Sequence, residues 1–422
     1  MRPSLATIAA ELQGYDPQAL RVNEVNAFLS RLAEPVTEHE YLDLFQALGR
    51  VLALDLVSPI NVPGHDNSAM DGYAFRSDDL VPDPALKLKV VGTALAGEAW
   101  RGDLARGECL KIMTGAVMPH GLDTVAPKEM VTLQDEYISI PAGILRPGDN
   151  RRFKGEDLAK GQEALLKGER ISPAALGLVA SLGIKQVPVY RRLKVAYFST
   201  GDEILSLGEP PREGAVYDSN RYTVFGMLSK LGCEVIDLGV VADDPVLLEA
   251  AFADAAGRCD AIITSGGVSV GEADFTKAMM KKLGDVAFWK IAMRPGRPMA
   301  VGRIGNALLF GLPGNPVAVM VTFLAFVRPA LLRLMGSKAQ LPPLLKAQTL
   351  EALRKKPGRT EYQRGIVSNA TDGSLTVRTT GNQGSGVLSS MVQANGLIVL
   401  HHQQGHVSIG DTVDVMMFDG AI

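Results

Sequence analysis

The feature that most constrains the fold lies between residues 191 and 340, where short apolar runs alternate with helical patterns. Strands are expected at residues 194–198, 234–241, 260–264, 286–291 and 307–310, and helices at 221–231 and from residues 244, 274 and 315. This alternation predicts a doubly wound, mostly parallel α/β domain with helices on both faces of the sheet. Because such sheets bind ligands outside the carboxyl ends of their strands, we expect the binding site there.

The remaining residues predict three smaller domains. Apolar residues recur at helical spacing in residues 1–57 and 151–190, which predicts one discontinuous helical linker or dimerisation domain. Residues 58–150 carry short strands with Gly or Pro every few positions, typical of a small β-rich domain. Residues 341–422 alternate apolar and polar side chains between Asp-Gly and Asn-Gly turns, which predicts a C-terminal β-barrel or sandwich.

Charge, cysteine usage and hydropathy exclude several classes of protein. The 43 Lys and Arg and 46 Asp and Glu give a net charge of −3, so we expect neither nucleic-acid nor membrane binding. Three distant cysteines, Cys109, Cys233 and Cys259, argue against a disulfide framework or a cysteine zinc site. The longest apolar run, residues 317–327, is too short for a bilayer that needs about 20 residues, so a cytoplasmic location is expected.

A glycine-rich loop at residues 265–274 follows one expected strand. No G-x-G-x-x-G or G-x-x-x-x-G-K-[ST] motif is present, which disfavours a Rossmann dinucleotide site and a Walker ATPase. Glycines here let backbone amides approach a phosphate at the start of a helix, or they serve only a tight turn with positive φ. Asp274 either caps that helix or holds a cation such as Mg²⁺ beside the phosphate. The candidate substrate-binding residues of this loop are Ser265, Gly266, Gly267 and Ser269.

Further carboxylates and cations follow other strands. Gly201, Asp202 and Glu203 form one strand end, and Asp243 and Asp244 precede Pro245 at another. Capping is the ordinary role of either residue of that aspartate pair, but several carboxylates on one rim need a cation to offset their repulsion.

A basic turn holds Lys290, Arg294 and Arg297 around a Pro-Gly pair, an arrangement suited to a tetrahedral oxyanion. Solvated surface charge is the alternative interpretation of this turn. The polar loop at residues 61–74 is either a site or a structural element, and its residue types leave both open.

Seven motifs together resemble those of the molybdopterin molybdenumtransferases. In order along the chain they are DNSAMDGYA, IMTGA, RRxxGED, FSTGDE, YDSNR, SGGVSVGEAD and LPGNPV, and the resemblance runs from about residue 20 to the end. It implies an L-shaped homodimer of four-domain subunits. It also implies Mg²⁺-dependent insertion of molybdenum from molybdate into adenylylated molybdopterin, with release of AMP. The resemblance places the site beside the α/β domain, completed by the other subunit.

The resemblance also implies roles for individual residues. Asp243 and Asp274 would hold Mg²⁺, while Lys290 would neutralise charge on the cleaved anhydride. Asp71 and Asp157 would position the dithiolene end or manage protons, and Glu203 is a further catalytic candidate. The residues expected to bind molybdate or the rest of the substrate are Thr114, Gly201, Asp202, Arg294, Arg297, Pro313, Asn315, Pro316, Arg364 and Ser385.

Three departures from the family pattern bear on the oxyanion. Arg294 and Arg297 stand where the family usually has Lys, and Ala318 stands where it commonly has Ser. These changes leave a tungsten-inserting variant open. A related molybdopterin adenylyltransferase is disfavoured, because those proteins are a single small domain, whereas a non-catalytic pterin-binding scaffold stays open. Expected partners are a second copy of the chain, an upstream adenylyltransferase and proteins that mature molybdoenzymes.

Overall fold

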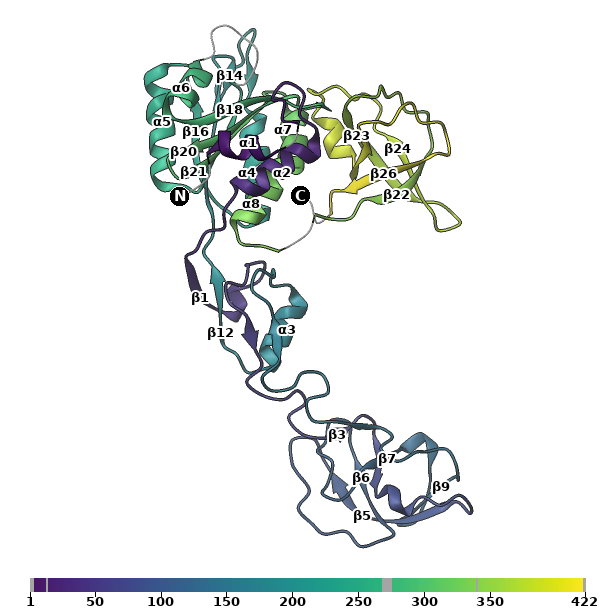
Figure 1. The fold of residues 1–422 in the computed structure, drawn as a ribbon. Coiled ribbons are helices and arrows are strands. Elements are labelled where there is room, and N and C mark those ends of the chain that lie inside the picture. The colour runs from purple at the N-terminus through teal and green to yellow at the C-terminus, as the bar shows by residue number, and fades with distance from the viewer. Residues whose placement is uncertain (1–3, 13, 268–274, 339–340, 420–422) are drawn as a thin grey trace.

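The computed structural model describes residues 4–12, 14–267, 275–338 and 341–419. The subunit is elongated (Figure 1). An α/β domain and a C-terminal β-domain lie side by side at one end, a small body follows, and a β-rich body lies at the far end. The multidomain architecture expected from the sequence is therefore confirmed.

The central sheet of the α/β domain is mixed. Its strand order is β16 (Glu234–Val241), β13 (Lys194–Thr200), β17 (Ala261–Ser265), β21 (Ala307–Leu312), β20 (Pro298–Ile304) and β18 (Gly284–Lys290). The first four strands are parallel, whereas β20 pairs antiparallel with both neighbours. The sequence prediction overlooked β20. Its connections to β18 and β21 are too short for a parallel crossover, so hairpins form instead.

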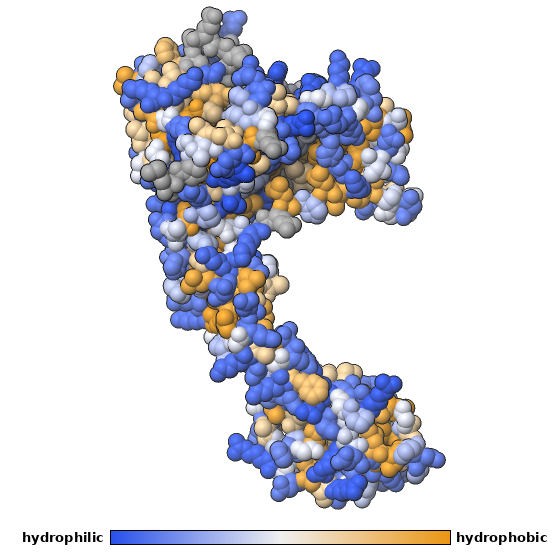
Figure 2. Space-filling model, viewed as in Figure 1, coloured by the Kyte–Doolittle hydropathy of each residue, from blue (hydrophilic) through white to orange (hydrophobic). Residues whose placement is uncertain are grey.

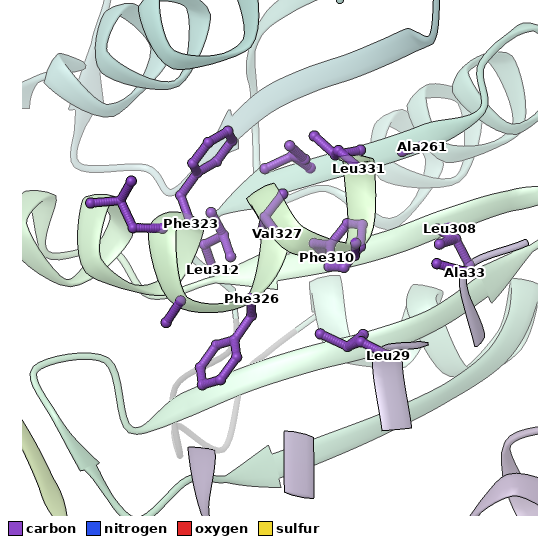
Figure 3. Close-up of a cluster of buried hydrophobic side chains, with 14 of the residues drawn as sticks. Leu29, Ala33, Ala261, Leu308, Phe310, Leu312, Phe323, Phe326, Val327 and Leu331 are labelled. Atoms are coloured by element: carbon purple, nitrogen blue, oxygen red, sulfur yellow. The ribbon is translucent and has the colours of Figure 1, made fainter. Parts of the chain in front are cut away.

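Helices cover both faces of this sheet and bury two separate cores. One face holds α4 (Ser219–Leu231) and the continuous segment α7 (Pro316–Thr322), η4 (Phe323–Val327) and α8 (Arg328–Leu334). The other face holds α5 (Pro245–Arg258) and α6 (Phe275–Leu283). In Figure 3, Phe323, Phe326 and Val327 lie among buried side chains that include Phe310 and Leu312 of β21. The helix Pro316–Leu334 is long and apolar enough to span a membrane, but it is 83% buried here.

The N-terminal helices pack on the α/β domain. They are α1 (Leu5–Glu11) and α2 (Val22–Leu32), and the ring of Phe28 meets the edge of Trp289 with centroids 5.0 Å apart. Leu29 and Ala33 belong to the same buried cluster as the long helix (Figure 3). This differs from the expectation that residues 1–57 belong with residues 151–190.

The small middle body is mostly strands and loops. Its elements are β1 (His39–Asp43) paired with β12 (Gln186–Tyr190), η1 (Leu44–Gln46), β2 (Leu56–Val57) paired with β11 (Glu163–Leu165), and α3 (Pro173–Ser181). The helical pattern expected over residues 1–57 was therefore wrong for residues 39–57, whereas the helix expected within residues 151–190 is present as α3. The helical periodicity misled because Tyr41 and Leu48 are exposed side chains, not core positions.

The far body is built on a six-stranded sheet. Its order is β7 (Thr124–Pro127), β4 (Gly72–Phe75), β6 (Glu108–Ile112), β5 (Leu86–Ala94), β9 (Tyr137–Ile140) and β8 (Thr132–Gln134). Short elements complete it: β3 (Asn67–Ser68) paired with β10 (Arg151–Arg152), η2 (Ser77–Asp79) and η3 (Lys128–Met130).

The C-terminal domain is a closed barrel. Strands β23 (Thr360–Asn369), β24 (Leu375–Thr379), β22 (Leu345–Thr349), β26 (Thr412–Met417) and β25 (Gly396–Leu400) pair in this order, and β23 closes the ring by pairing with β25. The short helix α9 (Ser389–Gln393) follows a loop at the barrel edge. From the α/β domain, β19 (Met293–Arg294) pairs with β23. The basic turn therefore connects the two domains.

Candidate active site

A cavity of about 810 Å³ lies where the carboxyl ends of β13, β17 and β21 face the barrel. The α/β domain supplies most of its wall, and the barrel supplies the loop around Gln383 and Ser385. Nine predicted site residues line it: Glu203, Ser265, Gly266, Gly267, Arg294, Pro313, Asn315, Pro316 and Ser385. The cavity therefore lies at the carboxyl end of the sheet, where the sequence predicts the binding site.

The two glycines of the SGG loop are required by the backbone. Gly266 has φ +91°, and a Cβ there would lie 2.3 Å from the carbonyl oxygen of Thr200. Gly267 has φ +65°, and a Cβ there would lie 2.5 Å from the Cβ of Thr276. The tight-turn interpretation is therefore confirmed, and phosphate binding stays a prediction for two residues that line the cavity. Ser269 and Asp274 lie outside the described residues.

Three buried hydroxyl groups join the two strands beneath the cavity. The Tyr197 hydroxyl lies 2.7 Å from Ser265 Oγ and 2.9 Å from Ser199 Oγ. Burial raises the pKa of Tyr197, so this hydroxyl stays protonated at neutral pH. The group therefore fixes Ser265 at the cavity floor without supplying charge.

The acidic residues separate into two roles. Asp244 caps α5, because its Oδ1 accepts hydrogen bonds from the N–H groups of Val246 (2.9 Å) and Leu247 (3.0 Å). Asp243 does not cap; its Oδ1 accepts a 3.4 Å hydrogen bond from Thr276 Oγ1. Burial raises the pKa of Asp243, and the negative charges of Asp202 and Glu203 add to the effect.

Asp243 therefore carries a carboxylate that is costly to ionise. A nearby cation would stabilise negative charges brought together in this way. Among the described residues, no Lys or Arg forms an ion pair with Asp243. Within the part of the chain that the structure describes, no cluster of three His, Cys, Asp or Glu could hold a metal ion.

Two arginines provide positive charge between the cavity and the barrel. Arg294 lines both the main cavity and an adjoining one of about 250 Å³, which Arg364 also lines. Arg364 is 1% exposed, and burial lowers its pKa to about 10, with the charge of Arg294 adding to the effect. Among the described residues, no carboxylate forms an ion pair with either guanidinium, so positive charge is concentrated here.

Arg364 also shapes the loop that closes the cavity. Its Nε donates to Ser390 Oγ (2.9 Å), and its Nη2 donates to the carbonyl oxygens of Asn382 (3.2 Å) and Gly384 (2.9 Å). Its Nη1 has no hydrogen bond to the described residues. The loop reaches the α/β domain because the Val317 N–H donates to the carbonyl oxygen of Ser385 (3.1 Å). Arg364 therefore holds the loop in place.

Some predicted site residues of the α/β domain do not line the cavity. These are Gly201, Asp202, Asp243, Lys290 and Arg297. Lys290 is half-buried at the end of β18, where its N–H donates to the carbonyl oxygen of Pro17 (2.8 Å). Arg297 is exposed on the turn after the Pro-Gly pair.

Asp71, Thr114 and Asp157 lie far from this cavity. Asp71 and Thr114 belong to loops of the far body, after β3 and β6, whereas Asp157 belongs to the segment between β10 and β11 that joins the far body to the middle body (Figure 1). Asp71 Oδ1 accepts hydrogen bonds from the N–H (2.9 Å) and hydroxyl (2.8 Å) of Thr114, and these bonds lower its pKa. Lys128 Nζ lies 3.6 Å from Asp71 Oδ2. The far body therefore presents an ionised carboxylate that one chain cannot bring to its own cavity.

Sequence reasoning missed several lining residues. Asp218 and Asn220 line the cavity from the start of α4, and the YDSNR motif that contains them was the signal that could have found them. Gln383 lines it from the barrel loop, where no motif drew attention to it. Its Oε1 accepts a 2.7 Å hydrogen bond from the Arg364 N–H, a contact between distant residues that spacing does not reveal.

Comparisons with known proteins agree along most of the chain. Three family profiles match: the MoeA N-terminal region (domain I and II) at residues 20–183, the "Probable molybdopterin binding domain" at 196–333, and the MoeA C-terminal region (domain IV) at 346–418. A curated relative from Haemophilus influenzae, named molybdopterin molybdenumtransferase, is 46% identical over 91% of this chain and 95% of its own. One of the same name from a Nostoc species is 35% identical, over 89% and 88%.

A solved structure gives the same result. The molybdopterin biosynthesis MoeA protein from Pyrococcus horikoshii superposes with a TM-score of 0.82 at 28% identity, over 95% of this chain and 100% of that one. Sequence and fold therefore agree from the far body to the barrel. The chain belongs to the MoeA family of molybdopterin molybdenumtransferases.

Proposed function

We propose that this chain is a molybdopterin molybdenumtransferase that inserts molybdenum from molybdate into adenylylated molybdopterin and releases AMP. The observation that carries the proposal is the cavity at the carboxyl end of the sheet, which combines phosphate-binding backbone with two neighbouring arginines. Relatives that share most of the chain bear this name. The names of these relatives state the activity, and the residues of the cavity indicate how this chain would perform it.

The phosphate groups of the substrate bind at the SGG loop and the start of α7. Gly266 and Gly267 expose backbone close to the cavity, and Pro316 begins a helix whose N-cap residue, Asn315, makes no side-chain cap hydrogen bond. Pro316 has no N–H and the Val317 N–H donates to the carbonyl oxygen of Ser385, so the Ala318 N–H is the donor of this first turn that is left for an anion. The substrate's pyrophosphate therefore has donors on two sides.

The residues around Asp243 suit a hard divalent cation. Carboxylate oxygens are the ligands that Mg²⁺ prefers, and Asp243 is a carboxylate crowded by two others. Asp243 would hold Mg²⁺, together with Asp274 from outside the described residues. When bound, Mg²⁺ would offset negative charge on the pyrophosphate.

Molybdate binds between Arg294 and Arg364. Both guanidinium groups are always charged at neutral pH and donate in a planar fork that fits tetrahedral oxyanions. Ser385 and Gln383 line the same region and supply polar contacts, whereas Ala318 offers no hydroxyl group. Arg297 adds long-range positive charge. Lys290 would neutralise the negative charge that develops when the anhydride is cleaved.

A second copy of the chain completes the site. Asp71 lies in the far body and Asp157 in the segment that joins it to the middle body, both away from the cavity of their own chain, so a partner's copy would bring them to it. The middle body exposes large apolar side chains suited to an interface, and Figure 2 shows hydrophobic residues gathered there. They are Tyr41, Phe45, Leu48, Leu54 and Val57, with Phe45 99% exposed. The arrangement supports a homodimer, and the resemblance to the family implies a cytoplasmic location and supply of the substrate by an adenylyltransferase.

The proposal is tested by AMP release from adenylylated molybdopterin. Purified protein and Mg²⁺ are incubated without oxyanion, with molybdate and with tungstate. Release stimulated by molybdate supports the transferase function. Stimulation by tungstate alone supports the tungsten variant and gives Arg294, Arg297 and Ala318 a functional meaning. Tight pterin binding with no release under any condition supports the scaffold and contradicts the proposal.

A further inference from the structure

The segment before residue 20 precedes the matched MoeA N-terminal region, yet it is anchored on the edge strand β18. The Leu5 N–H donates to Asp285 Oδ2 at 2.9 Å. The indole Nε1 of Trp289, which is 2% exposed, donates to the Tyr15 hydroxyl at 2.8 Å. Tyr15 also stacks on Phe28, with ring centroids 5.8 Å apart. These anchoring contacts reach the end of β18 that leads into the basic turn.

Residues 15–20, which we call the N-terminal arm, pair with the chain that leads into this turn. The Lys290 N–H donates to the carbonyl oxygen of Pro17, and the Ala292 N–H donates to that of Leu20, both at 2.8 Å. Leu20 is buried and forms a parallel bridge with the residue between the two donors. The arm therefore lies along the outer edge of this segment, where a further strand of a sheet would lie.

The opposite side of the same segment is held by the barrel and by the turn itself. The Ala292 carbonyl oxygen accepts a 2.9 Å hydrogen bond from the Thr360 N–H of β23, and Arg294 pairs with the next residue of that strand. The Ile291 N–H donates to the carbonyl oxygen of Arg297 at 2.7 Å. The backbone of the basic turn is thus held by the arm on one side and by the barrel on the other, so a shift of the arm would move the cations of the turn.

A turn at Asp16 gives the arm its spacing. Asp16 Oδ1 accepts a hydrogen bond from the Gln18 N–H (2.9 Å), and its carbonyl oxygen accepts one from the Ala19 N–H (3.1 Å). In a regular strand, carbonyl groups two residues apart face the same neighbour, whereas Pro17 and Leu20 are three residues apart. The turn takes up the additional residue, so both carbonyl oxygens reach donors that are two residues apart. Aspartate suits this turn because its side chain bonds to the backbone two residues further on.

We propose that the N-terminal arm positions the basic turn for its oxyanion, and that Asp16 is the positioning residue of this arm. The inference rests on the proposed function, because that function assigns molybdate to the turn. Asp16 is exposed and does not line the cavity, so it acts through the backbone of Lys290 and Ala292. Loss of its turn would loosen the arm and let Arg294 depart from the geometry that a tetrahedral oxyanion requires.

Three variants of the full chain test this role. Asp16→Ala removes the hydrogen bond to the Gln18 N–H, whereas Asp16→Asn removes the same charge but keeps an accepting oxygen. Asp372→Ala is the matched control. Asp372 Oδ1 accepts an equivalent 2.9 Å hydrogen bond from the Ser374 N–H, on an exposed hairpin of the barrel that does not line the cavity. Thermal unfolding checks that each variant folds.

Molybdate dependence distinguishes positioning from a structural role. Isothermal titration calorimetry with AMP and Mg²⁺ present measures molybdate binding, and AMP release from adenylylated molybdopterin measures activity. We expect Asp16→Ala to weaken molybdate binding, and to raise the molybdate concentration for half-maximal release, about three- to ten-fold. Asp16→Asn and Asp372→Ala should stay within about two-fold of the unaltered chain. A structural role alone would lower the unfolding temperature and leave the molybdate dependence unchanged.

Amide hydrogen exchange, followed by mass spectrometry, tests the coupling between arm and turn directly. The amides of Lys290 and Ala292 are the donors to the arm, so the peptide that contains them should exchange faster in Asp16→Ala. The other two variants should exchange there like the unaltered chain. Unchanged exchange in Asp16→Ala would contradict the coupling and with it the proposal.

The outcomes also separate this proposal from the proposed function. Unchanged molybdate binding in Asp16→Ala, or equal weakening in Asp16→Asn, overturns the positioning role. Weakened binding in Asp16→Ala, without AMP release from the unaltered chain, supports the positioning role and contradicts the transferase function. Stimulated release with the same molybdate dependence in Asp16→Ala as in the unaltered chain overturns the positioning role alone. An unaltered chain that neither binds molybdate nor responds to it contradicts both.

Discussion

Arg364 offers the sharpest test of whether a buried charge serves structure or function. The perturbation is Arg364→Met, which keeps much of the length of the side chain and removes its charge and donors. Three hydrogen bonds from a charged donor are lost, at about 1.5 kcal/mol each. The variant also removes a cost. Burial lowers the pKa of Arg364 to about 10 from an ordinary value above 12, which corresponds to about 3 kcal/mol for keeping the charge buried.

The two effects nearly cancel, so the free energy of unfolding should fall by only about 1–2 kcal/mol. Function should respond far more, because a charge-assisted bond to the oxyanion disappears. We expect the molybdate concentration for half-maximal AMP release to rise about thirty-fold or more. Urea unfolding and molybdate titration measure the two effects.

Arg378→Met is the matched control for this variant, because Arg378 is an exposed arginine on β24 of the same barrel. It should change neither quantity. A loss of more than about 4 kcal/mol in Arg364→Met, or an unchanged molybdate dependence, would refute the reasoning, because Arg364 would then be a structural residue.

Two further variants test the acidic cluster and the basic turn. Asp243→Asn should raise the thermal unfolding temperature while it abolishes Mg²⁺-dependent release. Because the folded-state pKa of Asp243 is raised, the folded chain binds the extra proton more tightly. Ionisation of Asp243 therefore lowers the free energy of unfolding as pH rises from the unfolded-state pKa through the folded-state pKa. The variant, which cannot ionise there, should not show this loss of stability with rising pH. Asp244→Asn, a cap replacement, should do neither. Gly296→Ala should destabilise the chain and weaken molybdate binding, because Gly296 has φ +93° and a Cβ would lie 2.4 Å from Thr322 Oγ1. Adding Thr322→Ala should restore only the stability lost through the clash. The cost of the positive φ, about 1–2 kcal/mol, should remain in the free energy of unfolding measured with urea. Full restoration of that free energy would contradict this reasoning.

The sequence predicted most of the α/β domain because its signals are local. Strand β16 was placed at residues 234–241, as observed, and the motifs after β13, β17 and β21 meet at one cavity. The antiparallel strand β20 was missed because its connections, not its composition, decide its direction. The helical pattern expected over residues 1–57 failed in residues 39–57, because exposed apolar residues such as Tyr41 and Leu48 imitate a buried helical face.

Site residues were predictable where a motif carried them and not where distant contacts did. Glu203 and Arg294 follow strands and could be found by position. The distinction between Asp243 and Asp244 needed the hydrogen bonds, because both precede Pro245 and either could cap the helix. The role of Gln383 depends on which loop it contacts, and no spacing in the chain encodes that.

The most direct test of the central claim is activity in mixed dimers. Asp71→Ala removes the carboxylate of the far body, and Arg294→Ala removes a cation of the cavity, so each variant alone should release no AMP in response to molybdate. If two chains build each site, coexpression of the two variants produces dimers with one intact site. Random pairing then predicts about a quarter of the unaltered activity. No recovery in isolated mixed dimers would contradict a site shared between subunits, and with it the role proposed for the far body.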